Sequence, residues 1–326
     1  MKQSAKHFFS TYFSPTFHGM TLRKWSILLR NNKIDFPYHF RLLPTTFKSL
    51  VNTFLAAIEK KKFEEQYKHI KIEPPIFILG HWRSGTTMLQ NIFARDTRFA
   101  FPNLYQVTNP YTFLLSEETF ITRLFSLLVP DNRLFDNVPF GLKSPHEDEF
   151  IAWHGSGLSP CLFWNFPKQS GKYDKYLSLK DCNHGEIENW RNEFLTFYKK
   201  LTFKYKKPLV LKSPTHTARL AELLSMFPQA KFIHIYRNPY RVYQSTKKLN
   251  AFILKISSFQ RFNPDKIHRR IINQYMEMHD IYFEEKRVIP SENLIEVQFE
   301  AFEKNPLKTL EAVYKKLNLP DFNVIK

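Results

Sequence analysis

A glycine-bounded turn directly after a short apolar run is the feature that most constrains how this chain can fold. The apolar run is Ile76–Leu79, and the turn Gly80–Thr87 that follows it holds two of only eight glycines in 326 residues. An apolar run of this length is typical of a strand buried on both faces. Residues 88–94 have a helical pattern, and strand, turn and helix in this order aim backbone N–H groups at an anion. The sequence therefore predicts a phosphate-binding loop at a strand end.

Three further apolar runs predict the rest of a sheet. They are Leu209–Leu211, Phe232–Tyr236 and Leu294–Val297. Between the first two, residues Thr217–Phe227 carry leucines at helical spacing, so that a strand, a helix and a strand follow one another. Such a unit joins parallel strands through a right-handed crossover. We therefore expect an α/β fold with a parallel central sheet.

The remaining segments are expected to surround this core within a single domain, 1–326. Residues 1–74 predict an N-terminal helical layer, because apolar side chains between 21 and 70 repeat at intervals of three and four. The core is expected over 75–245. It includes an aromatic and proline-rich insertion at 100–205, which we expect as helices and loops covering the substrate pocket. Residues 246–326 predict C-terminal helices and a closing strand.

The net charge of +18 is unevenly distributed. Residues 1–75 carry 13 basic and 5 acidic groups, whereas residues 76–160 carry 6 and 8. The excess could serve a polyanion or an anionic membrane surface. We expect no nucleic-acid partner, because no DNA- or RNA-binding signature accompanies the charge. The chain has two cysteines and no apolar run of about 20 residues, so we expect a cytoplasmic protein, and a peripheral contact with a membrane is a further expectation. The histidines do not have the spacing of a metal-binding site.

The residues after Gly85 distinguish between classes of nucleotide-binding protein. Gly80 and Gly85 have the spacing of a nucleotide P-loop, but Thr86 and Thr87 stand where a nucleoside-triphosphate enzyme has Lys and Ser or Thr. The nearest cation is Arg83, inside the turn. This loop suits a single phosphate with an attached anionic group better than a triphosphate. A P-loop-like nucleotide kinase and a non-enzymatic polyanion- or nucleic-acid-binding protein remain the alternatives.

The stretch from Pro75 to Thr87 resembles the 5′-phosphosulfate loop of sulfotransferases, which use 3′-phosphoadenosine 5′-phosphosulfate (PAPS) as donor. The form with Arg before Ser-Gly-Thr-Thr is most similar to the broad bacterial branch. The resemblance implies a three-layer α/β fold with P-loop-NTPase-like topology, PAPS as co-substrate and no metal. It also implies that the loop residues bind the 5′-phosphosulfate: Gly80, Arg83, Ser84, Gly85, Thr86 and Thr87.

Three other segments resemble the same family in the same order. In the family, an Arg at a strand end and a Ser eight residues later hold the 3′-phosphate, and Arg237 and Ser245 have this spacing. Val210–Pro214 resembles the strand that bears the catalytic lysine, here Lys212. Ser144–Phe150 resembles a segment of the bacterial branch. The resemblance implies that Lys212 and Arg83 stabilise charge in the transition state.

The general base is left open by the sequence, and so is the acceptor. Cytosolic sulfotransferases have a histidine where this chain has Pro214. The candidates are Glu147 and Glu149 in the acidic cluster, followed by His216. The acceptor is expected to carry a hydroxyl on a carbohydrate, a lipid, a phenol or another alcohol, and the oligomeric state is not indicated.

Overall fold

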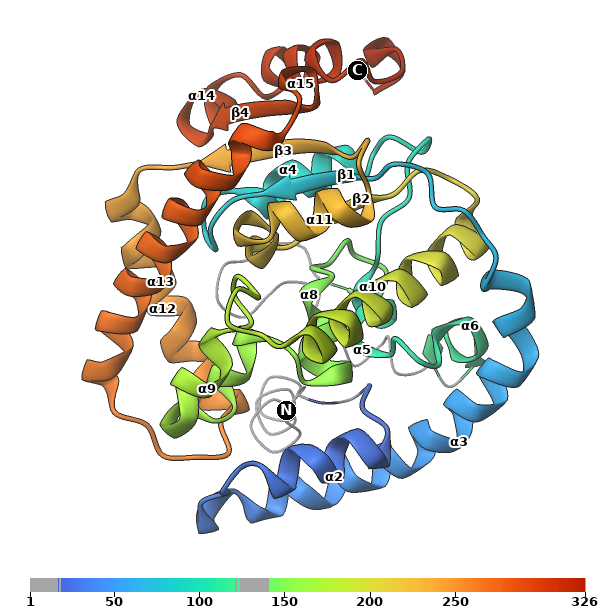
Figure 1. Cartoon of the computed structure of the whole chain (residues 1–326), viewed down its shortest axis with the longest axis vertical. Coiled ribbons are helices and arrows are strands. Elements are labelled where there is room, and N and C mark those ends of the chain that lie inside the picture. Colours follow the sequence, from blue (N-terminus) through green and yellow to red (C-terminus); the bar gives the residue numbers. More distant parts are fainter. Residues whose placement is uncertain (1–16, 18, 121, 124–140, 326) are drawn as a thin grey trace, which may run out of the picture.

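A four-stranded parallel sheet forms the centre of the computed structural model, which describes residues 17, 19–120, 122–123 and 141–325 (Figure 1). The strands stand in the order β2-β1-β3-β4. Their pairing is parallel throughout: Ile78 of β1 lies beside Lys212 of β2 and Ile233 of β3. The strands are β1 (Ile76–Leu79), β2 (Val210–Lys212), β3 (Lys231–Tyr236) and β4 (Leu294–Gln298). The α/β fold predicted from the apolar runs is confirmed.

Two apolar cores cover the two faces of the sheet, because successive side chains of a strand point to opposite faces. Ile76 and Ile78 of β1 belong to the core formed with α4 (Thr86–Phe93) and α15 (Pro306–Lys316). Phe77 and Leu79 belong to the larger core. That core is shared with α11 (Leu220–Met226), α12 (Pro239–Ser257), α13 (Pro264–Glu285) and most of the insertion. The result is the three-layer arrangement expected for this fold.

The helix predicted over Thr217–Phe227 has a different beginning. A 3₁₀ helix covers Pro214–Ala218, and α11 begins at Leu220. Pro214 occupies the first turn of the 3₁₀ helix, where its missing N–H leaves no hydrogen bond unmade. This tight segment is fully buried, so it places Thr215, His216 and Thr217 inside the protein at the end of β2.

The insertion between β1 and β2 consists of short helices and one long one. The short helices are α5 (Leu104–Thr108), α6 (Phe113–Ser116), α8 (Glu149–Ile151) and α9 (Ser170–Asp174), with a π-helix at Ala152–Ser156 and 3₁₀ helices at Pro160–Trp164 and Pro167–Gln169. The long helix α10 (His184–Tyr205) begins with a capping box made by Asn183 and Glu186. It contacts both α8 and α3. The insertion therefore connects the sheet to the N-terminal helices.

The N-terminal layer and the C-terminal helices lie at opposite ends of the molecule (Figure 1). The N-terminal layer comprises α2 (Leu22–Arg30), a 3₁₀ helix at Phe36–Arg41 and α3 (Leu42–Tyr67). Residues 1–16 of the predicted layer lie outside the described residues. At the other end, α14 (Phe299–Lys304) and α15 follow β4, and short 3₁₀ helices cover Lys286–Val288, Ser291–Asn293 and Phe322–Ile325. Within the described residues, none of the helices combines the length and apolarity that crossing a bilayer requires.

Candidate active site

The carboxyl ends of all four strands meet at one edge of the sheet, because the strands are parallel. The chain leaves β1 toward β2 on one side and later returns to form β3 on the other side. In open α/β sheets, ligands bind beyond the carboxyl ends at such a switch point. The turn Gly80–Gly85 emerges from β1 at this point, with Lys212 at the end of β2 and Arg237 directly after β3.

Both glycines of the turn are required by its geometry. Gly80 has φ +141° and Gly85 has φ +104°, in the region that favours glycine. A Cβ on Gly80 would collide with the carbonyl oxygen of Ile235 in β3, and a Cβ on Gly85 would collide with the ring of Phe299 at the start of α14. The sequence spacing of the two glycines thus reflects two close approaches of the turn, one to β3 and one to the start of α14.

The turn presents polar groups that suit an anion. The Ser84 hydroxyl is buried and has no hydrogen-bond partner among the described residues. Gly85 is the N-cap of α4, and no side chain caps the first turn of that helix, whose N–H groups therefore stay available for an anion. The Gly80 N–H donates to the Thr217 hydroxyl over 2.8 Å, which fixes the start of the turn against the 3₁₀ segment after β2.

Three residues predicted to bind phosphate meet on one side of the turn. Arg83, with φ 71°, directs its Nε at the Ser245 hydroxyl of α12 at 2.8 Å. Arg237 donates from Nη1 to the Arg83 carbonyl oxygen at 3.4 Å, and its guanidinium lies 4.2 Å from the ring centre of Phe299. The family resemblance implies that Arg83 binds the 5′-phosphosulfate of the donor. In the structure its side chain instead points toward Ser245, which the resemblance assigns to the 3′-phosphate.

On the other side of the turn, Lys212 forms an ion pair with Glu147. The Lys212 Nζ lies 2.7 Å from Glu147 Oε1. The lysine side chain is 2% exposed and the glutamate side chain 20% exposed, so the pair opens to solvent from the carboxylate side. The Asp148 N–H donates to the Lys212 carbonyl oxygen at 3.3 Å, which attaches the acidic segment to the end of β2.

The two residues after Glu147 are buried and pair with the segment after β2. His216 Nε2 lies 2.9 Å from Asp148 Oδ2, and both side chains are fully buried. Burial alone would raise the pKa of Asp148, but the nearby His216 and the hydrogen bonds from His216 and Tyr198 outweigh it and lower that pKa. The Glu149 side chain is 1% exposed and forms an ion pair with Arg219, with 2.6 Å between Glu149 Oε2 and Arg219 Nη1. It also accepts hydrogen bonds from Ser159 and Thr215.

His81, inside the turn, lies away from the anion-binding groups. Its ring packs against Tyr275 of α13, and its Nδ1 lies 2.8 Å from the Trp82 carbonyl oxygen. Burial lowers the pKa of His81 to about 4, so the ring is neutral near pH 7. This histidine therefore adds no positive charge to the site.

Sequence reasoning missed three residues of the site. Thr217 and Phe299 anchor the turn from neighbouring strand ends, and Asp148 pairs with His216. The one available signal for Phe299 is its position two residues after the predicted strand Leu294–Val297. Thr217 is predicted as the start of a helix, and no sequence pattern indicates a partner for it in the turn.

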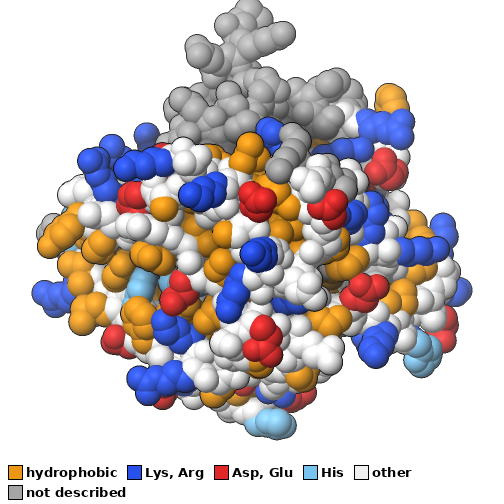
Figure 2. Space-filling view, turned by 90° about the horizontal axis from the view of Figure 1, so that it is seen from above, with side chains coloured by type: hydrophobic (Ala, Val, Ile, Leu, Met, Phe, Trp, Pro, Cys, Tyr) orange, Lys and Arg blue, Asp and Glu red, His pale blue; other side chains and the backbone are white. Residues whose placement is uncertain are grey.

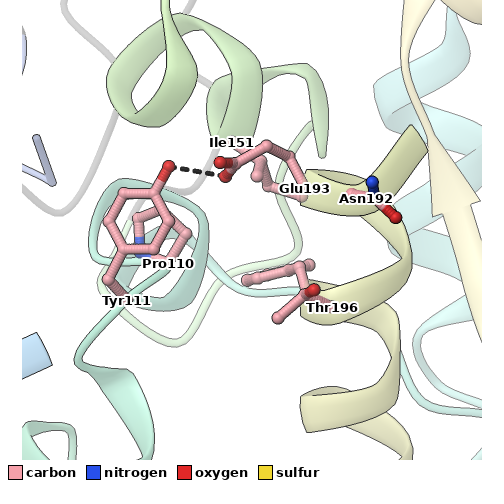
Figure 3. Close-up of a pocket in the computed structure, with 7 residues that line it drawn as sticks. Pro110, Tyr111, Ile151, Asn192, Glu193 and Thr196 are labelled. Carbon is pink, nitrogen blue, oxygen red and sulfur yellow. Dashed lines mark hydrogen bonds between the residues drawn. The ribbon is translucent and has the colours of Figure 1, made fainter. Parts of the chain in front are cut away.

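A cavity of about 140 Å³ lies elsewhere in the insertion (Figure 3). Ile151, Tyr111 and Glu193 are among its lining residues, and the Tyr111 hydroxyl donates to Glu193 over 2.5 Å. Lys24 of α2 also pairs with Glu193. None of the predicted site residues lines this cavity. Across the described part of the chain there is no group of three or more His, Cys, Asp or Glu side chains that could hold a metal ion.

Comparisons with known proteins show which family this chain is similar to. The omega-hydroxy-beta-dihydromenaquinone-9 sulfotransferase Stf3 of Mycobacterium bovis is 34% identical over 314 residues, which cover 95% of this chain and 80% of that protein. The enzyme of the same name from Mycobacterium tuberculosis gives the same values.

Two solved structures share the fold at low sequence identity. Sulfotransferase STF9 from Mycobacterium avium has a TM-score of 0.68 and 16% identity, covering 89% of this chain and 75% of that one. Sulfotransferase STF1 from Mycobacterium tuberculosis has a TM-score of 0.64 and 17% identity, covering 84% and 78%. A family model for sulfotransferases matches residues 74–323. The chain therefore belongs to the sulfotransferase family.

Proposed function

We propose that this protein transfers the sulfuryl group of PAPS to the hydroxyl of an apolar acceptor. The observation that carries this proposal is the division of charged groups around one turn. Arg83, Arg237 and Ser245 gather on one side of it, and the Lys212–Glu147 pair lies at the neighbouring strand end. The first group suits a bound phosphate, and the second suits charge and proton transfer at a reacting centre.

The turn fits the phosphosulfate end of the donor. The unsatisfied Ser84 hydroxyl, the N-terminus of α4 and the hydroxyls of Thr86 and Thr87 would hold its oxygens. Gly80 and Gly85 let the turn pass close to β3 and to α14, which would fix the direction of the backbone N–H groups of the turn toward the anion. Arg237 and Ser245 would hold the 3′-phosphate, with Arg83 reaching between the two ends of the donor.

The transfer step needs charge stabilisation and a proton acceptor. Lys212 would stabilise the charge that develops as the bond between sulfur and the bridging phosphate oxygen breaks. Glu147 would accept the proton of the attacking hydroxyl while the new sulfur–oxygen bond forms. The products are the sulfate ester of the acceptor and 3′,5′-ADP. The ion pair keeps both groups oriented before the acceptor binds, which reduces the reorganisation needed for reaction.

Glu147 suits the role of general base better than Glu149 or His216. Glu149 is buried and already bonds Arg219, Ser159 and Thr215. His216 is fully buried beside Asp148. A general base must come within hydrogen-bond reach of the acceptor hydroxyl. Of these three candidates, Glu147 is the one whose side chain is partly exposed at the site.

An apolar acceptor is supported by a series of aromatic rings next to Glu147. Phe150 packs against His146 at 4.3 Å between ring centres and against Trp153 at 5.0 Å. Trp153 contacts Trp164, which contacts Trp82 in the turn. Such rings favour an apolar or flat acceptor over a sugar-like one with many hydroxyls. The relative Stf3 is named for an omega-hydroxylated dihydromenaquinone, which is an apolar molecule with a terminal hydroxyl.

The test is a transfer assay with the purified full chain. PAPS or ATP would be supplied with an omega-hydroxylated isoprenoid quinone, a simple phenol or a monosaccharide, and products would be analysed by mass spectrometry. We expect a sulfate ester from PAPS, formed fastest with the quinone. Preference for the monosaccharide would contradict the apolar acceptor alone. A phosphorylated product from ATP would contradict the reaction itself and favour the kinase alternative.

A further inference from the structure

The buried side chains of helix α3 are mainly polar, and a row of exposed side chains on the same helix is apolar. Leu43, Phe47, Leu50, Phe54 and Ile58 are between 43% and 77% exposed. Their spacing of three and four places them on one face of the helix, and we call this face the apolar stripe. A surface helix of a water-soluble domain normally shows the reverse pattern.

The buried face of α3 is polar and forms hydrogen bonds and an ion pair with the rest of the protein. Asn52 donates to the Met20 carbonyl oxygen at 3.2 Å. Glu59 pairs with the buried Lys200 of α10 at 2.6 Å and accepts the Leu115 N–H at 3.0 Å. The Leu22 N–H donates to the Thr53 hydroxyl at 2.9 Å. These bonds fix the rotation of α3, so the apolar stripe cannot turn inward.

We propose that the apolar stripe of α3 docks this protein onto the surface of a membrane that contains anionic phospholipids. A helix that lies in the interface with its apolar face among the acyl chains is stabilised by the area it buries and by basic residues beside it. By the helical rise of 1.5 Å per residue, the 26 residues of α3 span about 39 Å, and the stripe extends over most of that length.

The charge along this segment is complementary to an anionic surface. From Phe36 to Ile58 the sequence has no acidic residue. The acidic residues at the two borders are already engaged: Asp35 pairs with Lys168 at 2.7 Å, and Glu59 pairs with Lys200. Exposed basic residues flank the stripe at both ends, Arg30 and Lys33 before it and Lys60, Lys61 and Lys62 after it. Basic residues close to an anionic bilayer are attracted to it, so these residues would strengthen docking at the stripe.

The position of the stripe favours a broad planar surface as its partner. Helix α3, which carries the stripe, runs along the outer edge of the molecule, away from α14 and α15 (Figure 1). The face that carries α14 and α15 shows acidic and basic side chains interspersed with apolar ones (Figure 2). The apolar stripe and the basic residues that flank it therefore lie on a different side of the molecule from this mixed face.

Membrane docking by the stripe is separate from the proposed sulfuryl transfer, and vesicle binding tests it without an activity assay. Vesicles of phosphatidylcholine, with or without phosphatidylglycerol, would be sedimented with the full-length chain. We expect binding to vesicles that contain phosphatidylglycerol, weakened by added salt. The variant Leu43→Asp/Phe47→Asp/Phe54→Asp is expected to lower the partition coefficient at least about tenfold, because three side chains no longer leave water.

A matched control separates the stripe from net charge. Ile272→Asp/Val288→Asp/Leu307→Asp changes the charge equally at exposed apolar positions on C-terminal elements, and it is expected to bind vesicles like the wild type. Lys61→Gln/Lys62→Gln is expected to reduce the salt-sensitive part of binding. Circular dichroism melting confirms that each variant is folded.

The proposal would be overturned if the wild type did not bind phosphatidylglycerol vesicles, or if the stripe variant bound them as well as the wild type. It would also be overturned by a dimer, seen by sedimentation velocity without lipid, that the stripe variant abolishes while vesicles bind neither protein. Such a dimer would assign the stripe to contact with another copy of the chain.

Discussion

At the scale of single residues, three consecutive acidic side chains have three different environments. Glu147, Asp148 and Glu149 face Lys212, His216 and Arg219, which are spaced by four and three residues along the chain. The acidic segment is attached to the segment after β2 at each of these steps. The pair that includes Lys212 is open to solvent on one side, and the other two pairs are enclosed.

This difference predicts opposite phenotypes for two conservative substitutions. Glu147→Gln should lower kcat/KM about 10²–10³-fold, because it removes the proton acceptor, with a smaller loss of stability than Glu149→Gln, because the Lys212–Glu147 pair is open to solvent on one side. Glu149→Gln should lower the free energy of unfolding by about 3–5 kcal/mol, because Arg219 would be left buried without its counter-charge. Steady-state kinetics and urea unfolding of both variants check this. Equal losses of activity with equal stability would contradict the assignment.

A second prediction concerns the buried His81. Its pKa is lowered from 6.5 to about 4 by burial, so between these values the unfolded chain binds more protons than the folded one. Stability should therefore be highest above pH 6.5 and fall as the pH decreases to 4, by about 3 kcal/mol for this site alone. Urea unfolding measured across this range tests it. His81→Gln should reduce the slope of the unfolding free energy against pH, and His184→Gln, at an exposed position, is the control. An unchanged slope in His81→Gln would contradict the effect that we assign to burial of His81.

At the scale of elements, the approach of α14 to the N-terminus of α4 determines the shape of the turn. Gly85→Ala should weaken binding of 3′,5′-ADP at least about tenfold and lower the melting temperature, because φ +104° and the Phe299 ring both oppose a side chain. Gly171→Ala is a matched control, since an added Cβ there has no atom within 4 Å. Calorimetric titration and thermal melts of both variants give the comparison. Wild-type affinity in Gly85→Ala would show that this approach is unimportant.

The elements of the core were predictable from sequence, and those of the insertion were not. Ile76–Leu79 is a strand because a short apolar run fits a position buried on both faces, and that information is local. The short helices of the insertion depend on distant partners, as when the Trp164 ring nitrogen donates to Asn250 of α12. The 3₁₀ segment at Pro214–Ala218 likewise depends on burial at the strand end, which the helical pattern of the leucines does not indicate.

Site residues, like the elements, could be predicted where local sequence determines their position and not where distant contacts do. The strand pattern alone brings four of these residues to one edge of the sheet. Lys212 ends β2, and Gly80 and Arg237 directly follow β1 and β3. Gly85 closes the turn after β1. The contact of Arg83 with Ser245 depends on the left-handed conformation of Arg83, which no sequence pattern signals. The roles of these residues in the reaction stay predictions until kinetics test them.

At the scale of the whole molecule, the sheet edge and the N-terminal helices face different partners. The insertion joins them, because α10 contributes Lys200 to α3 and Tyr198 to Asp148 beside the site. We propose that the chain is a single domain, 1–326, as expected from the sequence, and that its described part holds a donor at the sheet edge and a membrane at α3 as one rigid body. The polar bonds of α3 to this body leave its apolar side for an external partner.

The central claim is that the sheet edge binds a nucleotide with a 3′-phosphate. The most direct measurement is calorimetric titration of 3′,5′-ADP and of 5′-ADP into the wild-type chain and into Arg237→Ala. We expect the wild type to bind 3′,5′-ADP about tenfold to hundredfold more tightly than 5′-ADP, since charge-assisted bonds to the 3′-phosphate are made with one ligand alone. Arg237→Ala should remove most of that difference. Equal affinities in the wild type, or an unchanged difference in Arg237→Ala, would show that the sheet edge does not recognise the 3′-phosphate.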